Sequence, residues 1–312
     1  MSNELTVSVT YTDGGTETFG ADKTAGLVFM KERYTPFTLL KGTFIAGIQP
    51  ERIREVRLYR GNALLHRGTG DSAEYTVSRR SPRLSIVSYG YSKQLGQDFA
   101  EPGIISQPDL SAIIGGAGIT GVTCQQNTDT VNYVYFEDKT TYWNAACIYT
   151  MKAYGKYPFI RGANQVLCTP SGQQTFTRAE GSMVSFGRGQ QLGNIMSDVY
   201  TQDADDQWSY HLGNAFASAH NVTRKKYYPR EREWLYDLNV QLKYHMYFSD
   251  RGREYIKATF TGYAGEDICD KESISMTGYT GSPEISALTV RVTPKGTFTD
   301  MSFYFDSFCN VI

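Results

Sequence analysis

Short alternating runs separated by turn residues dominate the N-terminal part of this chain. Leu5 to Tyr11 alternates apolar and polar side chains, and the Asp13-Gly14-Gly15 turn lets Thr16 to Phe19 pair back as a hairpin. Further strands are predicted at Leu27 to Glu32, Phe37 to Ile45, Glu55 to Arg60, Ala63 to Arg67, Ala73 to Ser78 and Leu84 to Tyr89. Because short strands must close or pair to protect their edges, the region predicts a small barrel or sandwich.

The composition agrees with a β-rich protein and argues against several functions. The 312 residues include 23 Tyr, 16 Phe and 30 Gly, which is typical of a strand-and-turn protein, and they suffice for two or three domains. Lys plus Arg total 31 against 32 for Asp plus Glu, so we expect no specific nucleic-acid binding. No run approaches the ~18 apolar residues of a membrane span, and the N-terminus lacks a signal-peptide pattern. Synthesis in a cytoplasm is therefore expected.

Helical periodicity appears between residues 97 and 177, where we expect a small α/β domain. Thr140 or Thr141 can cap a helix that runs to Tyr154 and that Gly155 ends. Its apolar positions recur at spacings of three and four and include Trp143, Cys147, Met151 and Tyr154. Tyr157 to Ile160 and Gln165 to Cys168 follow as a predicted hairpin, and a shorter helix is expected from Asp109 to Ile114.

Strand alternation returns from Met183 onward, and a second helix interrupts it. Pro229 can lie in the first turn of that helix, and Trp234, Leu238 and Leu242 form its apolar stripe. The predicted strands are Val184 to Arg188, Ile195 to Thr201, Gln207 to Leu212, Tyr255 to Tyr263, Ser273 to Thr277, Ile285 to Thr293 and Met301 to Asp306. A barrel interrupted by a helix is the simplest interpretation of this half.

No residue pattern predicts a catalytic, cofactor-binding or metal site. The four histidines, at 66, 211, 220 and 245, lack metal-ligand spacing. The five cysteines, at 124, 147, 168, 269 and 309, form no CxxC pair and are expected to be free, partly buried thiols. Gly116 to Gly121 matches G-x-G-x-x-G, but a helix precedes it and a β-prone run follows, so a simple glycine-rich loop is favoured over a nucleotide site.

Three charged clusters are interpreted as surface features. Asp203, Asp205 and Asp206 lack the remaining ligands of a calcium loop, so a solvated turn is favoured. Glu266, Asp267 and Asp270 are interpreted as turn residues between strands rather than an acid–base pair. The basic residues from Arg224 to Lys226, with Arg230, are interpreted as a solvated helix entry rather than a phosphate contact.

Two segments carry a resemblance to a known family. The first is residues 136–170, FEDKTTYWNAACIYTMKAYGKYPFIRGANQVLCTP. The second is residues 219–268, AHNVTRKKYYPREREWLYDLNVQLKYHMYFSDRGREYIKATFTGYAGEDI. Together with the order of barrel, α/β domain and interrupted barrel, they resemble the baseplate hub proteins of contractile phage tails and tail-like particles, the late control protein D family. Leu84 to Leu95 and the helix near Asp109 carry the resemblance more weakly.

The resemblance implies a β-rich α+β fold with two small tube-protein-like antiparallel β-barrels and a small α/β domain between them. The first barrel would comprise residues 1–96 and the middle domain residues 97–177, joined by the inserted helix at about 229–250. Residues 178–220 and 255–312 would form the second barrel. The expected core of the middle domain comprises Trp143, Cys147, Met151, Tyr154, Trp234, Leu238 and Leu242.

The resemblance also implies a structural virion protein with no enzymatic activity. A homotrimer would form a pseudo-sixfold ring that joins the hexameric tail tube to the trimeric central spike in a virion or tail-like particle assembled in a bacterial cytoplasm. Its partners would be itself, the tube protein, the spike protein and other baseplate proteins, with the tape measure protein left open. An alternative is a carbohydrate-binding or glycan-cleaving tail-associated protein, for which Trp143 and Trp208 are candidate sugar contacts.

Overall fold

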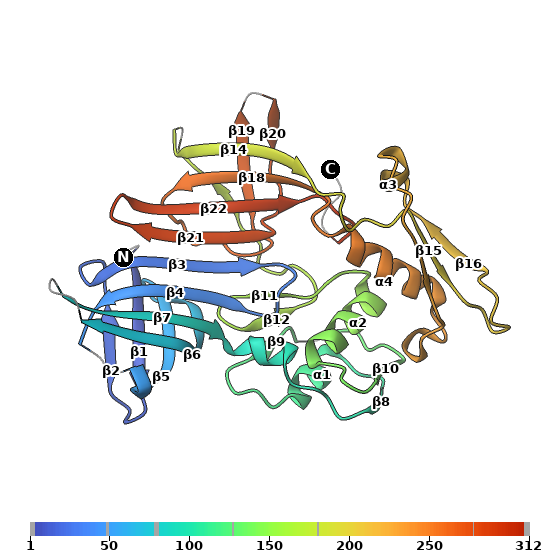
Figure 1. Ribbon diagram of the computed structural model, residues 1–312, viewed down its shortest axis with the longest axis horizontal. Coiled ribbons are helices and arrows are strands. Elements are labelled where there is room, and N and C mark those ends of the chain that lie inside the picture. Colours follow the sequence, from blue (N-terminus) through green and yellow to red (C-terminus); the bar gives the residue numbers. More distant parts are fainter. Residues whose placement is uncertain are drawn as a thin grey trace.

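One large antiparallel sheet contains strands from both the N-terminal and the C-terminal part of the chain (Figure 1). The computed structural model describes residues 4–47, 50–77, 81–126, 128–179, 181–276 and 278–308. In spatial order the 11 strands are β14 (Met183–Gln190), β18 (Glu254–Thr261), β22 (Gly296–Tyr304), β21 (Ala287–Thr293), β3 (Thr24–Glu32), β4 (Thr38–Ile45), β7 (Pro82–Gly90), β6 (Ala63–Val77), β5 (Ile53–Arg60), β1 (Leu5–Tyr11) and β2 (Thr16–Phe19). The expected β-rich fold class with barrel-like antiparallel sheet is confirmed.

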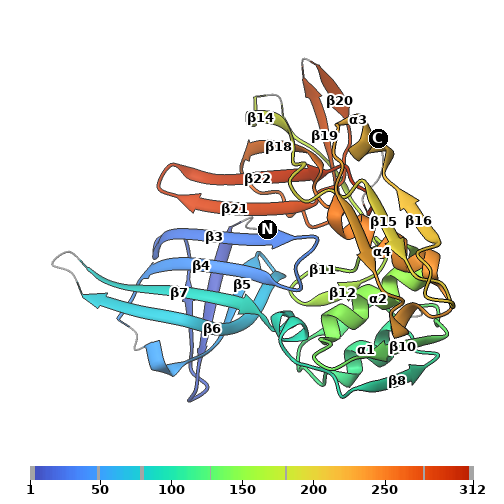
Figure 2. The same ribbon diagram turned by 45° about the vertical axis from the view of Figure 1, so that its right-hand side comes forward.

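Strands from the two ends of the chain meet where β21 pairs with β3. The pairing runs antiparallel from Ala287 opposite Glu32 to Val292 opposite Leu27, and Figure 2 shows the same two strands side by side from a second direction. One apolar core extends beneath both strand groups and includes Val7, Phe29, Leu288 and Phe303. The two groups therefore share a sheet and a core, and the division into two barrels at the expected boundaries remains a prediction.

Alternation of buried and exposed side chains explains why these segments form strands. In β4, Thr38, Leu40 and Phe44 point into the core, and Phe44 stacks on Phe19 of β2 with ring centroids 4.6 Å apart. The two strands expected at Ala63 to Arg67 and Ala73 to Ser78 prove to be one long strand, β6. It pairs with β5 through its first part and with β7 along its second, since an irregularity between Gly70 and Ser72 bends it without ending it.

The middle region packs helices against short strands. It contains η2 (Tyr91–Gly96), β8 (Gly103–Ser106), α1 (Leu110–Gly116), β9 (Thr123–Cys124), β10 (Tyr133–Phe136), α2 (Tyr142–Tyr154), β11 (Phe159–Arg161) and β12 (Gln165–Leu167). Helix α2 begins as predicted, because Thr141 Oγ1 accepts a hydrogen bond from the Asn144 amide at 3.1 Å. It ends at Gly155, whose φ of 61° is the left-handed conformation that glycine adopts without strain. The predicted hairpin forms as β11 and β12.

The second helix, α4 (Leu238–Asp250), begins later than the expected Pro229. Residues Lys225–Tyr228 form β17, which pairs parallel with β15 (Asp198–Thr201), so the chain is still extended when it reaches Pro229. The turn η3 (Arg232–Trp234) follows before α4 starts. Strands β15 and β16 (Tyr210–Gly213) were expected in the second barrel, yet with β17 they form a separate sheet that packs on α4. The short helix α3 (Ala215–Ala219) follows β16.

A third small sheet stands at one side of the large one, visible at the top of Figure 1. It comprises β13 (Thr175–Thr177), β19 (Lys271–Met276) and β20 (Tyr279–Gly281), with β13 and β19 parallel. Within the described ranges, no helix has the length and apolar character needed to cross a membrane.

Replacing Trp143 with Ala is expected to destabilise the protein by about 3–5 kcal/mol, because the side chain is buried in the core around α2. Urea unfolding followed by circular dichroism measures the change. Tyr236→Ala is the matched control: Tyr236 is 80% exposed, so its loss is expected to change the free energy of unfolding by less than about 0.5 kcal/mol. Equal losses in the two variants would show that α2 does not hold the core of the middle region.

Candidate functional site

The residues expected to form the core of the middle region fall into two clusters. Trp143, Cys147, Met151 and Trp234 are buried together, and Tyr154 packs half-buried against them. Leu242 lies instead in a smaller cluster with Met196, Val199 and Met246, beneath the separate β15–β16–β17 sheet. Leu238 is half-buried at the start of α4. Helix α4 therefore serves two cores, with Tyr244 and Phe248 facing the middle region and Leu242 facing the separate sheet.

The histidines lie apart and each has its own local partner. His66 is fully buried between Thr38 Oγ1 at 2.6 Å and Ser88 Oγ at 2.8 Å, and burial lowers its pKa to about 3, so the ring stays neutral. The others bond to separate side chains, His211 to Asp198, His220 to Gln190 and His245 to Glu231. Across the part of the chain that the structure describes, no cluster of His, Cys, Asp and Glu could hold a metal ion.

The glycine run and the thiols carry no reactive arrangement. Gly116 ends α1, and the loop to Gly121 leads into β9, which reverses the strand–loop–helix order of a dinucleotide motif. Cys124, Cys147 and Cys168 are free and buried, Cys269 is also buried, and burial raises the pKa of Cys147 and of Cys168 to about 12. These two thiols therefore stay protonated at neutral pH, the form that is neither nucleophile nor metal ligand. Cys309 lies outside the described residues.

The acidic cluster in residues 264–270 is the main departure from the sequence interpretation. Its carboxylates were expected in an exposed turn, but Glu266 and Asp270 are at most 1% exposed and Asp267 is mostly buried. Each pairs with a cation from a different part of the chain: Glu266 with Arg178, Asp267 with Lys31 at 2.5 Å, and Asp270 with Arg161 at 2.6 Å. We call this arrangement of three acids and three cations the ionic junction.

The ionic junction connects three regions of the fold. Lys31 lies in β3 of the large sheet, Arg161 ends β11 of the middle region, and Arg178 follows β13 of the third small sheet. Backbone groups complete the connections: Asp267 accepts a hydrogen bond from the Gly162 amide at 2.7 Å, and Asp270 accepts one from the Gln174 amide at 2.9 Å. The same short segment therefore fixes the middle hairpin, the third sheet and the large sheet relative to one another.

Burial acts against the charged forms within the junction. Desolvation lowers the pKa of the fully buried Lys31, while Asp267 raises it by direct contact. Beside the junction, Glu272 of β19 is fully buried, and its nearest cation is Arg178, at 3.4 Å. Arg178 already serves Glu266, and neither Glu272 oxygen accepts a hydrogen bond from the described residues. Desolvation therefore raises the pKa of Glu272 to about 7.

A second buried ion pair joins α2 to the segment before α4. Lys152 of α2 pairs with Glu233 of η3, and Glu233 also accepts the Tyr135 amide at 2.6 Å. The Lys152 ammonium lies over the rings of Tyr133 and Trp234, 4.0 and 5.3 Å from their centroids. Burial raises the pKa of Glu233 to about 7, although Lys152 and the Tyr135 amide favour its charged form. This pair positions η3, and with it α4, on the middle region.

The remaining charged clusters lie at the surface of the β15–β16–β17 sheet. Asp203 closes its own turn by accepting the Asp205 and Gln207 amides, each at 2.9 Å, and the Ser209 hydroxyl at 2.6 Å, which agrees with the predicted solvated turn. Arg224 to Lys226 were expected at a helix entry, but Lys225 and Lys226 belong to β17. Their side chains alternate across that strand, as in any pleated strand. The ionic junction and the Lys152–Glu233 pair hold parts of the fold in place relative to one another.

Comparison with known proteins identifies the fold. No protein-family model and no curated protein sequence matches this chain. Among solved structures, the chain is similar to a tail protein from Neisseria meningitidis, with a TM-score of 0.73 and 12% identity over 96% of each chain. It is equally similar to the 43 kDa tail protein of prophage MuSo2 from Shewanella oneidensis, with a TM-score of 0.73 and 10% identity over 98% of this chain and 99% of that one.

A weaker structural similarity extends to a secretion-system protein. An E. coli protein described as a component of the type VI secretion system, with structural similarity to the bacteriophage T4 tail proteins gp27 and gp5, has a TM-score of 0.53. It shares 9% identity over 93% of this chain and 76% of that one. The chain thus has the fold of phage tail proteins along nearly its whole length.

Replacing Lys31 with Met is expected to destabilise the protein by about 3 kcal/mol or more, because Asp267 would lose its buried counter-charge. Urea unfolding at neutral pH measures the loss. Lys23→Met is the control, since Lys23 faces Glu17 at 3.7 Å with half of its side chain exposed, and a change of at most about 1 kcal/mol is expected there. A Lys31 variant as stable as this control would remove the ionic junction from the determinants of the fold.

The pH dependence of stability is expected to change when Glu272 is replaced with Gln. The folded pKa of Glu272, about 7, lies above the ordinary glutamate pKa of 4.5, so the contribution of Glu272 to stability is fully present below about pH 4.5 and is lost as pH rises through 7. The midpoint temperature of thermal unfolding should therefore fall more steeply between pH 4.5 and pH 8 for the natural protein than for the Glu272→Gln variant. Glu74→Gln, at an exposed position, should keep the natural slope. Parallel profiles for all three proteins would contradict the assignment.

Proposed function

We propose that this protein is a structural component of a phage tail or tail-like particle, and that it acts as a homotrimeric baseplate hub. The observation that carries the proposal is that strands from the N-terminal and C-terminal parts of the chain form two groups within one large sheet, joined where β3 pairs with β21. Three copies would present six such groups, so one trimer could match a hexameric tube on one side and a trimeric spike on the other. The ring would be pseudo-sixfold, because its two kinds of strand group differ in sequence.

The extent of the structural similarity supports this assignment. The Neisseria and Shewanella tail proteins align over nearly their full lengths, so the similarity covers the whole arrangement of sheet, middle region and α4 rather than one common motif. A chain in a structure of a Francisella PdpA–VgrG complex also aligns with 98% of this chain, over 58% of its own length, at 9% identity and a TM-score of 0.55. By extension, we propose the tube protein, the central spike and other baseplate proteins as partners, and the baseplate as the location.

We propose a role without enzymatic activity, since the described polar residues serve packing and positioning. Buried carboxylates that pair with Arg or Lys hold elements together, and none of those in the ionic junction reaches a neutral His. A hub subunit must instead keep its own regions fixed relative to one another while it contacts other copies and partner proteins. The ionic junction and the Lys152–Glu233 pair supply rigid connections between the regions of one subunit.

The carbohydrate-binding alternative has less support. Of its two candidate tryptophans, Trp143 is 4% exposed and belongs to the core, whereas Trp208 is 43% exposed and packs edge-on against Tyr227. A sugar stacks on a free ring face. The neighbouring Tyr200 offers none, because its ring is stacked between those of Tyr227 and His211. We therefore place the hub first.

A measurement of the mass and the position of the protein tests the proposal. The purified chain is expected to sediment at three times its 35.0 kDa mass, alone or with the spike protein of its own particle. In images of the assembled particle, a label on this chain is expected on the particle axis, between tube and spike. A label away from the axis, or a subunit count that is not a multiple of three, would overturn the proposal.

A further inference from the structure

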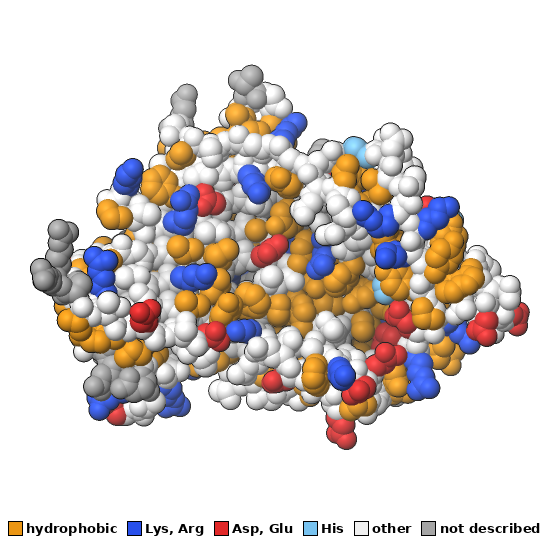
Figure 3. Space-filling view, viewed as in Figure 1, with side chains coloured by type: hydrophobic (Ala, Val, Ile, Leu, Met, Phe, Trp, Pro, Cys, Tyr) orange, Lys and Arg blue, Asp and Glu red, His pale blue; other side chains and the backbone are white. Residues whose placement is uncertain are grey.

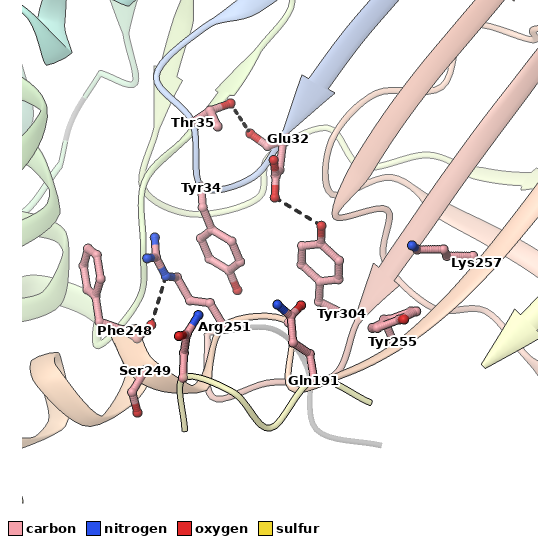
Figure 4. A pocket seen from close by; sticks show the side chains of 12 residues that line it. Glu32, Tyr34, Thr35, Gln191, Phe248, Ser249, Arg251, Tyr255, Lys257 and Tyr304 are labelled. Carbon is pink, nitrogen blue, oxygen red and sulfur yellow. Dashed lines mark hydrogen bonds between the residues drawn. The ribbon is translucent and has the colours of Figure 1, made fainter. Parts of the chain in front are cut away.

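A groove crosses one face of the molecule between the large sheet and α4. It consists of two adjoining cavities of about 380 and 450 Å³, which share Asn194, Phe248 and Ser249. Figure 4 shows the first cavity, with Glu32 and Tyr34 contributed by β3 and the segment after it, and with Arg251 contributed from the end of α4. The second cavity continues past His245 to Arg224 and Lys226.

Cations outnumber carboxylates in this groove by four to one. Arg224, Lys226, Arg251 and Lys257 line it, and Glu32 is the one acidic residue in its lining. The whole protein, in contrast, has a net charge of -1. Figure 3 shows Lys and Arg side chains around the hydrophobic surface between the large sheet and α4. The groove is thus a local positive site on a nearly neutral protein.

None of the four cations has a carboxylate within 4 Å among the described residues. Arg251 donates to the Phe248 carbonyl at 3.0 Å, and Arg224 donates to the Ile195 carbonyl at 2.6 Å. Lys257 lies 4.8 Å from the Tyr255 ring centroid. Glu32, the internal acid, accepts a hydrogen bond from the Tyr304 hydroxyl at 3.1 Å. The cations are therefore positioned by neutral groups, and their charge is available to a ligand.

The complementary charge lies on the same chain, at the turn between β15 and β16. Asp203, Asp205 and Asp206 occupy this turn, which projects from the body of the molecule at the right of Figure 1. Asp203 is committed to its own turn, where the hydrogen bond from the Ser209 hydroxyl, above all, lowers its pKa, and the charge of Arg230 acts in the same direction. Asp205 and Asp206 are exposed, and no ion pair to either occurs among the described residues.

A subunit cannot place this turn in its own groove. Strands β15 and β17 run parallel, with Val199 opposite Lys226 and Thr201 opposite Tyr228, so the groove residues of β17 lie beside β15 while the acidic turn lies beyond the end of β15. The turn therefore points away from the Lys226 of its own chain. A contact between the two must join different copies, and such a head-to-tail contact closes into a ring when the rotation between copies is 120°.

Resting on the proposed homotrimer, we propose that the acidic turn at residues 203–206 of one copy binds in the basic groove of the next copy. Asp205 and Asp206 would meet Lys226 and Lys257, and the aromatic rings of Tyr255 and Phe248 would cover the backbone of the turn. A nucleic acid fits less well, because a phosphate backbone requires a continuous row of cations, whereas Glu32 interrupts this one.

Reciprocal charge exchange tests the contact. The turn variant carries Asp205→Lys and Asp206→Asn, because Asn tolerates the φ of 59° at position 206. The groove variant carries Lys226→Glu and Lys257→Glu, both at exposed positions. In sedimentation equilibrium of the full chain at low salt, each variant is expected to associate at least about tenfold more weakly than the natural protein. A single chain that carries all four changes is expected to recover most of the association, and added salt should weaken the natural contact.

Lys295→Glu is the matched control. Lys295 is exposed in the turn before β22, about 30 Å along the chain from Tyr304 in the groove, and reversal of its charge is expected to leave association unchanged. If the natural protein associates and neither the turn nor the groove variant differs from it, the contact is wrong while the hub proposal stands. If the groove variant associates more weakly and the chain with all four changes does not recover association, the groove binds an occupant other than the acidic turn.

Two further outcomes would also overturn the contact. A natural protein that stays monomeric at every concentration does not make it, and the particle images then decide the hub proposal separately. Binding of a 20-base-pair DNA duplex that the groove variant loses, with self-association unchanged, would assign the groove to nucleic acid.

Discussion

The arrangement of this protein depends on three buried carboxylates in one short segment. Glu266, Asp267 and Asp270 draw Arg178, Lys31 and Arg161 from separate regions into one place. Removal of such charges from water costs several kcal/mol per ion, and their attraction repays it only when the partners are correctly placed. The pairs therefore contribute little net stability, but any arrangement of the sheet, the hairpin and the third small sheet that separates them is strongly disfavoured. Apolar contacts discriminate less between such arrangements, since packed surfaces can shift relative to one another and stay in contact.

Local patterns in the sequence predicted the strands and helices well, and failed where distant contacts decide. The range of β1, and both ends of α2 with its Thr141 cap and Gly155 stop, follow from alternation and capping. Helix α4 starts late because β17 pairs with β15 from more than 20 residues away, which no local pattern encodes. The expected fold class follows from the number and spacing of short strands.

The ionic junction was missed, although one signal for it was present. Lys31 stands two residues after Phe29 and four after Leu27, so the alternation of β3 already places it on the buried face. A cation at such a position requires a buried acid, and the acidic segment at 266–270 was a candidate. Its assignment to an exposed turn came from glycine at position 265, which correctly indicates a turn but does not show whether the turn is covered. Burial of a turn is a property of the whole fold.

The pairing of β3 with β21 has a consequence for the order in which the protein forms. Strand β3 is complete at residue 32, whereas its neighbour β21 begins only at residue 287. During translation the seven N-terminal strands can fold while the outer edge of β3 still lacks its partner, and contacts between residues so distant in sequence form slowly. For most of its synthesis, the nascent chain therefore exposes a strand edge that other nascent copies can occupy. Production of this protein depends on keeping that edge unpaired until the last strands emerge from the ribosome.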